Sequence, residues 1–263
     1  MRPRTARVTV LGSGTSEGVP SIACRCATCR SDDPRDRRWR ASIAIECPDG
    51  TSVLIDTTPD LRSQALAFRL FRVDAILYTH GHADHMMGLD DVRRFNVLQQ
   101  AAIPCYADGA TVGELRRAFQ YVFDEGTPEG GGIPRIAVFR IAGAFSLGGC
   151  TVVPVTLLHG PREILGYRFG SFAYLTDCSA IPAPSWPLLE GVETLMIDAL
   201  RADPHPTHFS VTQALDVVGR LRPARAYFTH ISHELRHAET CARLPAGVEL
   251  AYDGLTMEFD AGA

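Results

Sequence analysis

The sequence predicts an α/β fold arranged as a four-layer αββα sandwich, in which helices cover the outer faces of two sheets. Three observations predict it. Short apolar, β-branched runs recur in both halves of the chain, helical periodicity is interspersed among them, and no linker separates the halves. We therefore expect the 263 residues to form a single domain, 1–263, which is long enough to bury a core without disulfides.

The predicted strands are runs of four to seven mostly apolar residues, which are typical of buried strands. They span residues 8–11, 43–46, 53–56, 75–79, 152–158, 173–176, 194–197 and 226–229. Apolar residues at helical spacing predict helices at 87–100, 112–122, 211–221 and 235–244, with Ser210 as the N-cap of the third. The glycine-rich segment 124–134 is expected to be a flexible connection or lid.

Composition excludes several kinds of chemistry. All 26 basic residues are arginine, and the absence of lysine excludes Schiff-base, Walker-type and kinase-type lysine catalysis. The net charge of −4 disfavours binding along a nucleic-acid backbone. No run of 18 apolar residues predicts a membrane span, and the short apolar stretch after the basic residues 1–7 does not resemble a signal-peptide core, so a cytoplasmic location is expected.

The eight cysteines favour a reduced compartment with one metal site over a disulfide framework. Three of them lie close together, at Cys24, Cys26 and Cys29, and the other five are scattered. A closed zinc site needs four ligands, so the trio requires a partner from elsewhere in the chain. A free or disulfide-bonded trio is the alternative.

The strongest chemical signal is a segment with three histidines and an aspartate, His80-Gly-His82-Ala-Asp84-His85, between a predicted strand and a predicted helix. Imidazoles and a carboxylate this close together are poor core material, but they suit Zn²⁺, Fe or Mn²⁺. His80 and His82 are two residues apart and can share one ion, while Asp84 and His85 can reach a second.

Two coordination spheres need further ligands from downstream. His159, Asp177 and His230 each follow a predicted strand as its first polar residue, which is where α/β architectures place ligands. Three such residues at equivalent strand ends, together with the 80–85 segment, indicate a dinuclear site.

The combination of the 80–85 motif with these three residues resembles the metallo-β-lactamase superfamily. The opening segment Leu11-Gly-Ser-Gly-Thr-Ser-Glu-Gly-Val-Pro20, the cysteine trio and the segment Thr229-His230-Ile231-Ser232-His233 resemble one branch of it, the PhnP phosphodiesterases of the C–P lyase pathway of phosphonate metabolism. This similarity extends over nearly the whole chain.

The resemblance implies particular roles for these residues. It implies that His80, His82 and His159 hold one metal ion, that Asp84, His85 and His230 hold a second, and that Asp177 bridges both. It also places the general acid at His208, and it implies a Cys₃His zinc site completed by His233. An odd offset in an extended segment lets His230 and His233 face opposite sides, which fits that arrangement.

The remaining residues carry weaker signals. Asp56 is expected to orient a ligand histidine, and Ser13 and Thr15 form either a phosphate cradle or a loop that turns into the core. Arg162 is the candidate phosphate contact. The arginines at 35, 37, 38 and 40 are expected to form a solvated face, and His205 and His237 are expected to have no role in the chemistry.

These observations together predict a dinuclear metal-dependent phosphodiesterase. A metal-bridging hydroxide would attack phosphorus, with Asp84 and Asp177 in the metal site and His208 protonating the leaving oxygen. The resemblance implies two active-site ions (Zn²⁺ or Mn²⁺), one structural Zn²⁺, a small substrate such as a cyclic sugar phosphate, and a homodimer. The alternatives are tRNA 3′-end processing on the same scaffold, and a non-hydrolytic PqqB-like or di-iron protein.

Overall fold

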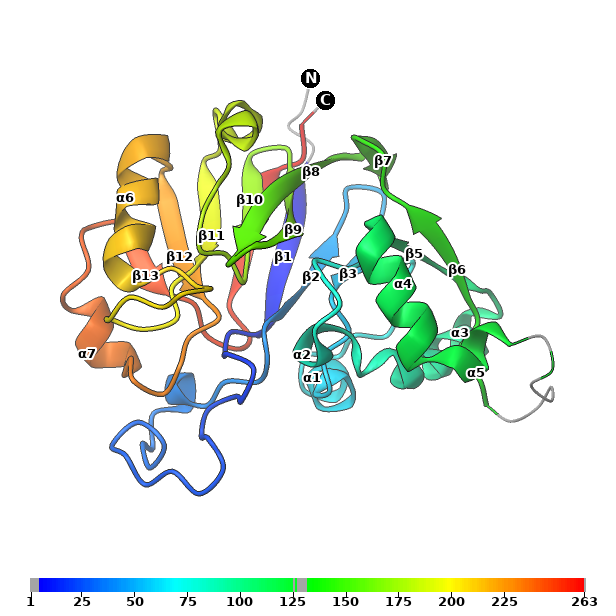
Figure 1. Ribbon diagram of the computed structural model, residues 1–263, viewed down its shortest axis with the longest axis horizontal. Coiled ribbons are helices and arrows are strands. Elements are labelled where there is room, and N and C mark those ends of the chain that lie inside the picture. Colours follow the sequence, from blue (N-terminus) through cyan, green and yellow to red (C-terminus); the bar gives the residue numbers. More distant parts are fainter. Residues whose placement is uncertain (1–4, 125, 127–131, 263) are drawn as a thin grey trace.

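The computed structural model describes residues 5–124, 126 and 132–262, and within this range the chain forms two seven-stranded sheets with helices on their outer faces (Figure 1). The middle of the glycine-rich segment predicted to be a flexible connection or lid, residues 127–131, lies outside the described residues. Among the described residues, no helix has both the length and the apolar character that a bilayer crossing requires.

The first sheet has the strand order β14-β1-β2-β3-β4-β5-β6. Its strands are β1 (Thr5–Gly12), β2 (Ser42–Glu46), β3 (Ser52–Ile55), β4 (Ala75–Leu77), β5 (Ile103–Ala107), β6 (Ile136–Arg140) and β14 (Thr256–Asp260). Pairing is antiparallel from β14 to β3 and parallel from β3 to β6.

The second sheet has the order β13-β12-β11-β10-β9-β8-β7. Its strands are β7 (Phe145–Leu147), β8 (Cys150–His159), β9 (Arg162–Phe169), β10 (Phe172–Leu175), β11 (Thr194–Asp198), β12 (Arg225–Thr229) and β13 (Val248–Leu250). Pairing is antiparallel from β7 to β10 and parallel from β10 to β13, so β8, β10, β11 and β12 all end at the same edge.

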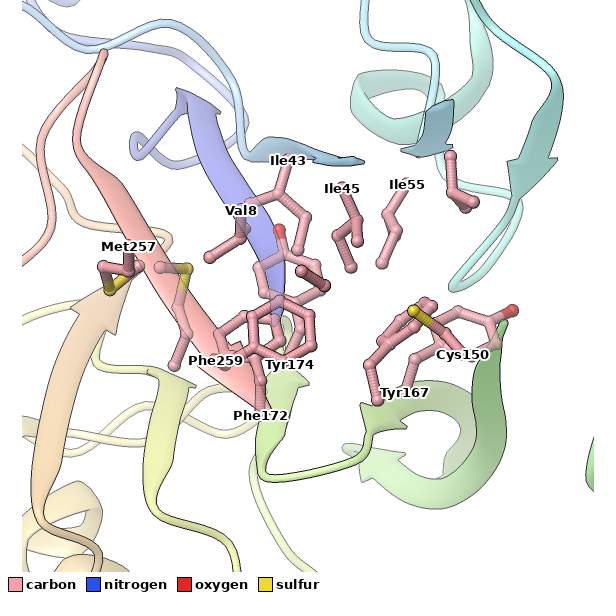
Figure 2. Close-up of a cluster of buried hydrophobic side chains, with 14 of the residues drawn as sticks. Val8, Ile43, Ile45, Ile55, Cys150, Tyr167, Phe172, Tyr174, Met257 and Phe259 are labelled. Atoms are coloured by element: carbon pink, nitrogen blue, oxygen red, sulfur yellow. The ribbon is translucent and has the colours of Figure 1, made fainter. Parts of the chain in front are cut away.

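Three apolar clusters fill the interfaces between the four layers, one between the sheets and one between each sheet and its helices. The central cluster lies between the sheets and joins residues of the first sheet, such as Val8 and Ile55, to Tyr167 and Tyr174 of the second (Figure 2). Along β10, alternate side chains face this cluster and the outer one, which explains why the buried strands read as continuous apolar runs.

Helices cover the two outer clusters. On the first sheet these are α1 (Leu61–Ala67), α2 (Ala83–Met86), α3 (Arg93–Gln99), α4 (Gly109–Ala118) and α5 (Gln120–Phe123). On the second they are α6 (Val211–Leu221) and α7 (His237–Cys241) (Figure 1). Short 3-10 helices add η1 (Pro34–Asp36), η2 (Leu89–Val92) and η3 (Ala183–Leu189). The predicted four-layer αββα sandwich is confirmed.

The eight predicted strands are confirmed, but six others, β5, β6, β7, β9, β13 and β14, were not predicted. Helix α6 has the predicted bounds, and Ser210 caps it with a capping box completed by Gln213. The other three helix predictions differ from the structure. Residues 87–100 form η2 and α3, residues 112–122 contain the break between α4 and α5, and α7 spans only five residues.

Candidate metal centre

Asp56 organises the first half of the site. It follows β3, is fully buried, and accepts hydrogen bonds from the Thr79 amide (2.8 Å), the Thr79 hydroxyl (2.8 Å) and His85 Nδ1 (2.7 Å). The Thr79 oxygen in turn lies 3.0 Å from His80 Nδ1 and can accept its proton. Because the Nδ1 atoms of His80 and His85 are engaged in this way, their Nε2 atoms are left as the ligand atoms.

The second half of the site comes from the strand ends of the second sheet. His159 is the last residue of β8, and its Nδ1 donates to the Thr207 carbonyl at 2.9 Å. Asp177 and His230 follow β10 and β12, and the Thr176 hydroxyl donates to Asp177 Oδ1 at 2.9 Å. The parallel register from β10 to β12 aligns these ends, so their side chains leave the same edge of the sheet.

The two halves meet in two ligand groups. The ligand atoms of His80, His82 and His159 lie within 4.8 Å of one another, as do those of Asp84, His85, Asp177 and His230. Asp177 lies where the groups adjoin. Its Oδ2 is 3.2 Å from His85 Nε2 and 3.7 Å from His80 Nε2, and its Oδ1 is 3.1 Å from His230 Nε2.

The chemistry of these side chains fits divalent cations. The buried Nε2 atoms of His80, His85 and His230 have no hydrogen-bond partner among the described residues. Burial alone would lower the pKa of His85, but the carboxylates of Asp177, Asp84 and Asp56 outweigh it and raise that pKa well above its usual value. The site therefore favours positive charge at a point surrounded by imidazole nitrogens. A bound cation would balance the carboxylates and would also give the unpaired Nε2 atoms a partner.

His208, the predicted general acid, lies at the edge of this cluster. Its ring centroid is 4.8 Å from those of His159 and His230, and its Nδ1 is 2.7 Å from Asp198 Oδ2. Asp198 is not among the residues predicted for the site, although it is the polar residue that ends β11 and therefore lies at a strand end, as Asp177 and His230 do. His205, whose ring centroid is 5.2 Å from that of His208, is partly exposed.

The cysteine trio and His233 form a second group of possible metal ligands, with ligand atoms within 4.8 Å of one another. His233 Nδ1 lies 3.4 Å from Cys24 Sγ and 3.3 Å from Cys26 Sγ. The contact with His233 lowers the pKa of Cys26 to about 6, whereas burial raises the pKa of Cys29 to about 11. All eight cysteines are free thiols, so the trio is not disulfide-bonded.

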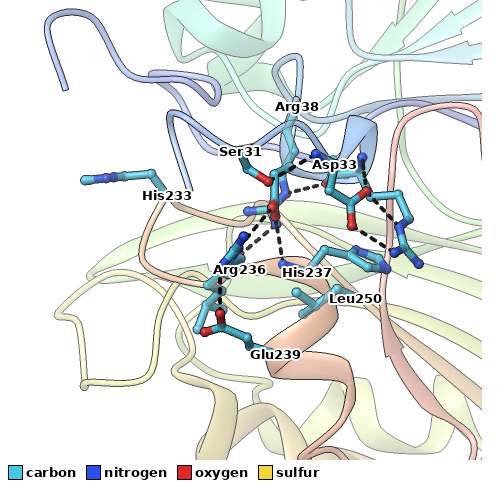
Figure 3. A network of polar contacts seen from close by, with 12 residues as sticks. Ser31, Asp33, Arg38, His233, Arg236, His237, Glu239 and Leu250 are labelled. Carbon is cyan, nitrogen blue, oxygen red and sulfur yellow. Dashed lines mark hydrogen bonds and ion pairs between the residues drawn. The ribbon is translucent and has the colours of Figure 1, made fainter. Parts of the chain in front are cut away.

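A buried arginine ties this cysteine loop to the histidine segment, and the expectation of a solvated arginine face was wrong at this position. Arg38 is only 2% exposed, donates to the carbonyls of Ser232 (2.9 Å) and Leu235 (2.7 Å), and pairs with Asp36. In Figure 3, His233 points away from this network. Burial lowers the pKa of Arg38, and the carboxylate of Asp36 opposes that effect.

Ser13 and Thr15 act on the same segment. The amide and hydroxyl of Ser13 both donate to Asp253 Oδ1, at 2.8 and 2.7 Å, and the Thr15 amide donates to the Ile231 carbonyl at 3.1 Å. Both amides and the Ser13 hydroxyl are therefore used within the protein, which favours the reading of a loop that turns into the core. This loop braces the residue next to His230.

Arg162, the candidate phosphate contact, begins β9 directly opposite His159 and pairs with Glu114 of α4. Glu114 is not among the predicted site residues, because it lies 48 residues from Arg162 in the chain and no local pattern indicates the pair.

Comparison with known proteins agrees with this geometry. Residues 51–231 match the family described as the beta-lactamase superfamily domain. The chain is 48% identical to a structure of a new diphosphatase from the PhnP family, with a TM-score of 0.92, covering 98% of this chain and 99% of that one. Zn²⁺-bound PqqB from Methylobacterium extorquens shares the fold at 20% identity and a TM-score of 0.76, covering 95% of this chain and 99% of that one.

A curated relative, the octanoyltransferase of Porphyromonas gingivalis, is 36% identical over 97% of this chain. The chain spans only about half of that protein (52%), so the name describes a molecule with a second half that this chain does not match. The match over 51–231, the two mixed sheets and the His/Asp cluster lead to one conclusion: the chain belongs to the metallo-β-lactamase superfamily and is similar to its PhnP-family members.

Proposed function

We propose that the protein is a dinuclear metal-dependent phosphodiesterase that hydrolyses a small phosphodiester. The observation that carries this proposal is the convergence of seven imidazole and carboxylate side chains from the strand ends of both sheets, with Asp177 where the two ligand groups adjoin and His208 beside them.

In this proposal His80, His82 and His159 hold one divalent ion (Zn²⁺ or Mn²⁺), Asp84, His85 and His230 hold the other, and Asp177 contacts both. When bound, such ions lower the pKa of water toward about 7 and neutralise charge on a phosphoryl oxygen. Asp56 and the Thr207 carbonyl fix the rings of His85 and His159 in the orientation that this requires.

His208 is the proposed general acid. Its Nδ1 is held by Asp198, so its Nε2 is free to deliver a proton to the departing oxygen. Burial lowers the pKa of His208, while the carboxylates of Asp177 and Asp84 raise it. Burial thus promotes proton release, and Asp198 keeps the ring aligned.

Cys24, Cys26, Cys29 and His233 are proposed to hold a structural Zn²⁺. Four soft or borderline ligands close such a site and leave no position for substrate. Its role would be to fix the cysteine loop against the segment that carries His230.

The substrate class is proposed from the resemblance and from the relatives. A cyclic sugar phosphate is the first candidate, and the name of the similar diphosphatase adds a diester of diphosphate as a second. The net charge of −4 supports a small molecule over tRNA. The homodimer and the cytoplasmic location remain predictions.

The test is hydrolysis of bis(p-nitrophenyl) phosphate by the metal-loaded protein, beside p-nitrophenyl phosphate and a chromogenic β-lactam. We expect turnover of the diester alone, abolished by chelator and restored by Zn²⁺ or Mn²⁺. Turnover of the β-lactam alone would assign a different reaction. No turnover of any ester, with a visible di-iron spectrum, would favour the non-hydrolytic alternative.

A further inference from the structure

An arginine at the mouth of the site is held in place from the opposite half of the molecule. Arg162 begins β9 and lies opposite His159 in the β8–β9 register. Directly opposite residues of an antiparallel pair share a face, so the side chain of Arg162 emerges beside this proposed ligand. The connection is the tight turn of Gly160 and Pro161, with Gly160 in the left-handed region at φ +59°.

Glu114 fixes where the guanidinium lies. Its Oε2 is 2.5 Å from Arg162 Nη2. The same oxygen packs against Gly81, where an added Cβ would lie only 1.9 Å from it. The ion pair therefore sits over the residue between His80 and His82.

The pair leaves most of the guanidinium available. Glu114 accepts from one of its nitrogens, and no other hydrogen-bond acceptor for the guanidinium occurs among the described residues. The side chain is 26% exposed. A guanidinium held at one corner presents its other N–H groups in a fixed plane, which suits the oxygens of a phosphoryl group. Because the chain has no lysine, arginine is the only side chain with a permanent positive charge that can serve here.

We propose that Arg162, oriented by Glu114, binds a second anionic group of the substrate, next to the phosphoryl group taken by the His/Asp cluster. The preferred substrate is then a diester of diphosphate. This deepens the proposed function and rests on it.

The reaction on such a substrate is hydrolysis of the diphosphate bridge. Water adds to one phosphorus, the bond between that phosphorus and the bridging oxygen breaks with the electron pair on the oxygen, and two phosphate monoesters result. His208 supplies the proton to the leaving phosphate, and the attacking water returns one to solvent.

The test compares Arg162→Gln and Glu114→Gln with wild type on ADP-ribose, which has two adjacent phosphoryl groups, and on bis(p-nitrophenyl) phosphate, which has one. We expect Arg162→Gln to lower kcat/KM for ADP-ribose roughly 10- to 100-fold, mainly through KM, and to change the single diester by less than about threefold. Glu114→Gln keeps the positive charge of Arg162 but removes the carboxylate that orients it. Its loss of kcat/KM for ADP-ribose should therefore lie between those of wild type and Arg162→Gln. Arg72→Gln, which breaks an exposed pair with Asp74 before β4, is the matched control.

Binding gives a readout independent of turnover. Calorimetry on the metal-loaded protein should show wild type binding ADP more tightly than AMP, and Arg162→Gln should remove most of that preference. Equal losses of kcat/KM on both substrates, or an unchanged preference for ADP over AMP, would show that Arg162 does not bind a second phosphate. If wild type fails on bis(p-nitrophenyl) phosphate, the proposed function is wrong, and the ADP and AMP affinities still decide the role of Arg162.

Discussion

Three buried residues of the site, Asp56, Asp177 and His230, have left-handed backbone conformations, with φ of 65°, 57° and 57°. Each follows the end of a strand, and none is glycine, so each conformation costs about 1 kcal/mol or more. The turn that directs each side chain into the site also takes the chain out of the sheet. Strained backbone conformations of this kind cluster at functional sites, where the surrounding structure holds the residue in place.

Sequence patterns identify which residues end strands, but they do not reveal partners across the fold. His159, Asp177 and His230 follow apolar runs, and the structure brings them together with the 80–85 segment. Arg38 stands in a run of similar arginines, and nothing local shows that it alone turns into the core. Its partners, the carbonyls of Ser232 and Leu235, are nearly 200 residues away in the chain.

At the same scale, replacing His208 tests its role as proton donor. His208→Ala should lower kcat roughly 10²- to 10⁴-fold for 2′,3′-cyclic AMP, whose alkoxide leaving group needs a proton. The loss should be under about tenfold for bis(p-nitrophenyl) phosphate, because p-nitrophenolate leaves without one. Steady-state kinetics on both substrates measure the difference. His205→Ala is the control and should change neither rate by more than about threefold, whereas equal losses on both substrates with His208→Ala would contradict a general-acid role.

At the scale of elements, three of the six missed strands share a physical cause. Strand β9 begins with Arg162 and Glu163 and also carries Arg168, so it lacks the apolar run that marked β10 or β11. Strand β14 alternates exposed and buried residues, and β13 has only three residues. Pairing with a neighbouring strand stabilises all three, and a pattern within one segment cannot show that.

The long excursion between β1 and β2 is held at its cysteine cluster and at Arg38, and both contact the segment just after His230. Replacing one cysteine therefore has consequences for two elements. Cys26→Ala should lose one metal ion per chain, because three ligands remain, and it should lose most of the activity as the 230–233 segment relaxes. Elemental analysis and diester hydrolysis measure the two effects.

The control for that prediction is Cys105→Ala, which removes a fully buried thiol from the outer core of the first sheet. It should keep all its metal. Full metal content in Cys26→Ala as well would refute the zinc site, even if activity fell.

At the scale of the molecule, the site joins two halves that also pack together through the apolar layer between the sheets (Figure 2). His80, His82, Asp84 and His85 come from the first half, and His159, Asp177 and His230 from the second. Ions bound here bind only the folded arrangement. At a free ion concentration of 100 times Kd they would add about 2.7 kcal/mol to the free energy of unfolding.

Chelation should therefore lower the Tm of wild type by roughly 5–10 °C. The matched variant is Asp177→Asn, which impairs the dinuclear site and keeps the Cys₃His group. Its Tm should be lower before chelation and should fall less on chelation. Thermal scans with and without chelator measure both. An equal fall in the two proteins would mean that the stabilising ion sits only at the cysteines.

Stability should also depend on pH through His237, which is 3% exposed and packs against Tyr252. Burial, with Arg35 and Arg38 nearby, lowers its pKa to about 4, although Asp33 and Asp36 oppose this. The unfolded chain takes up this proton near pH 6.5 and the folded chain does not. The free energy of unfolding should therefore fall as pH drops from about 6.5 to about 4, by up to roughly 1.4 kcal/mol per pH unit.

Urea titrations of wild type and His237→Gln test this. The variant should be less stable than wild type at pH 7, and the difference between their free energies of unfolding should narrow by about 1–2 kcal/mol at pH 5. Loss of active-site metal at pH 5 affects both proteins alike, so a gap of constant size would assign the acid sensitivity to other groups.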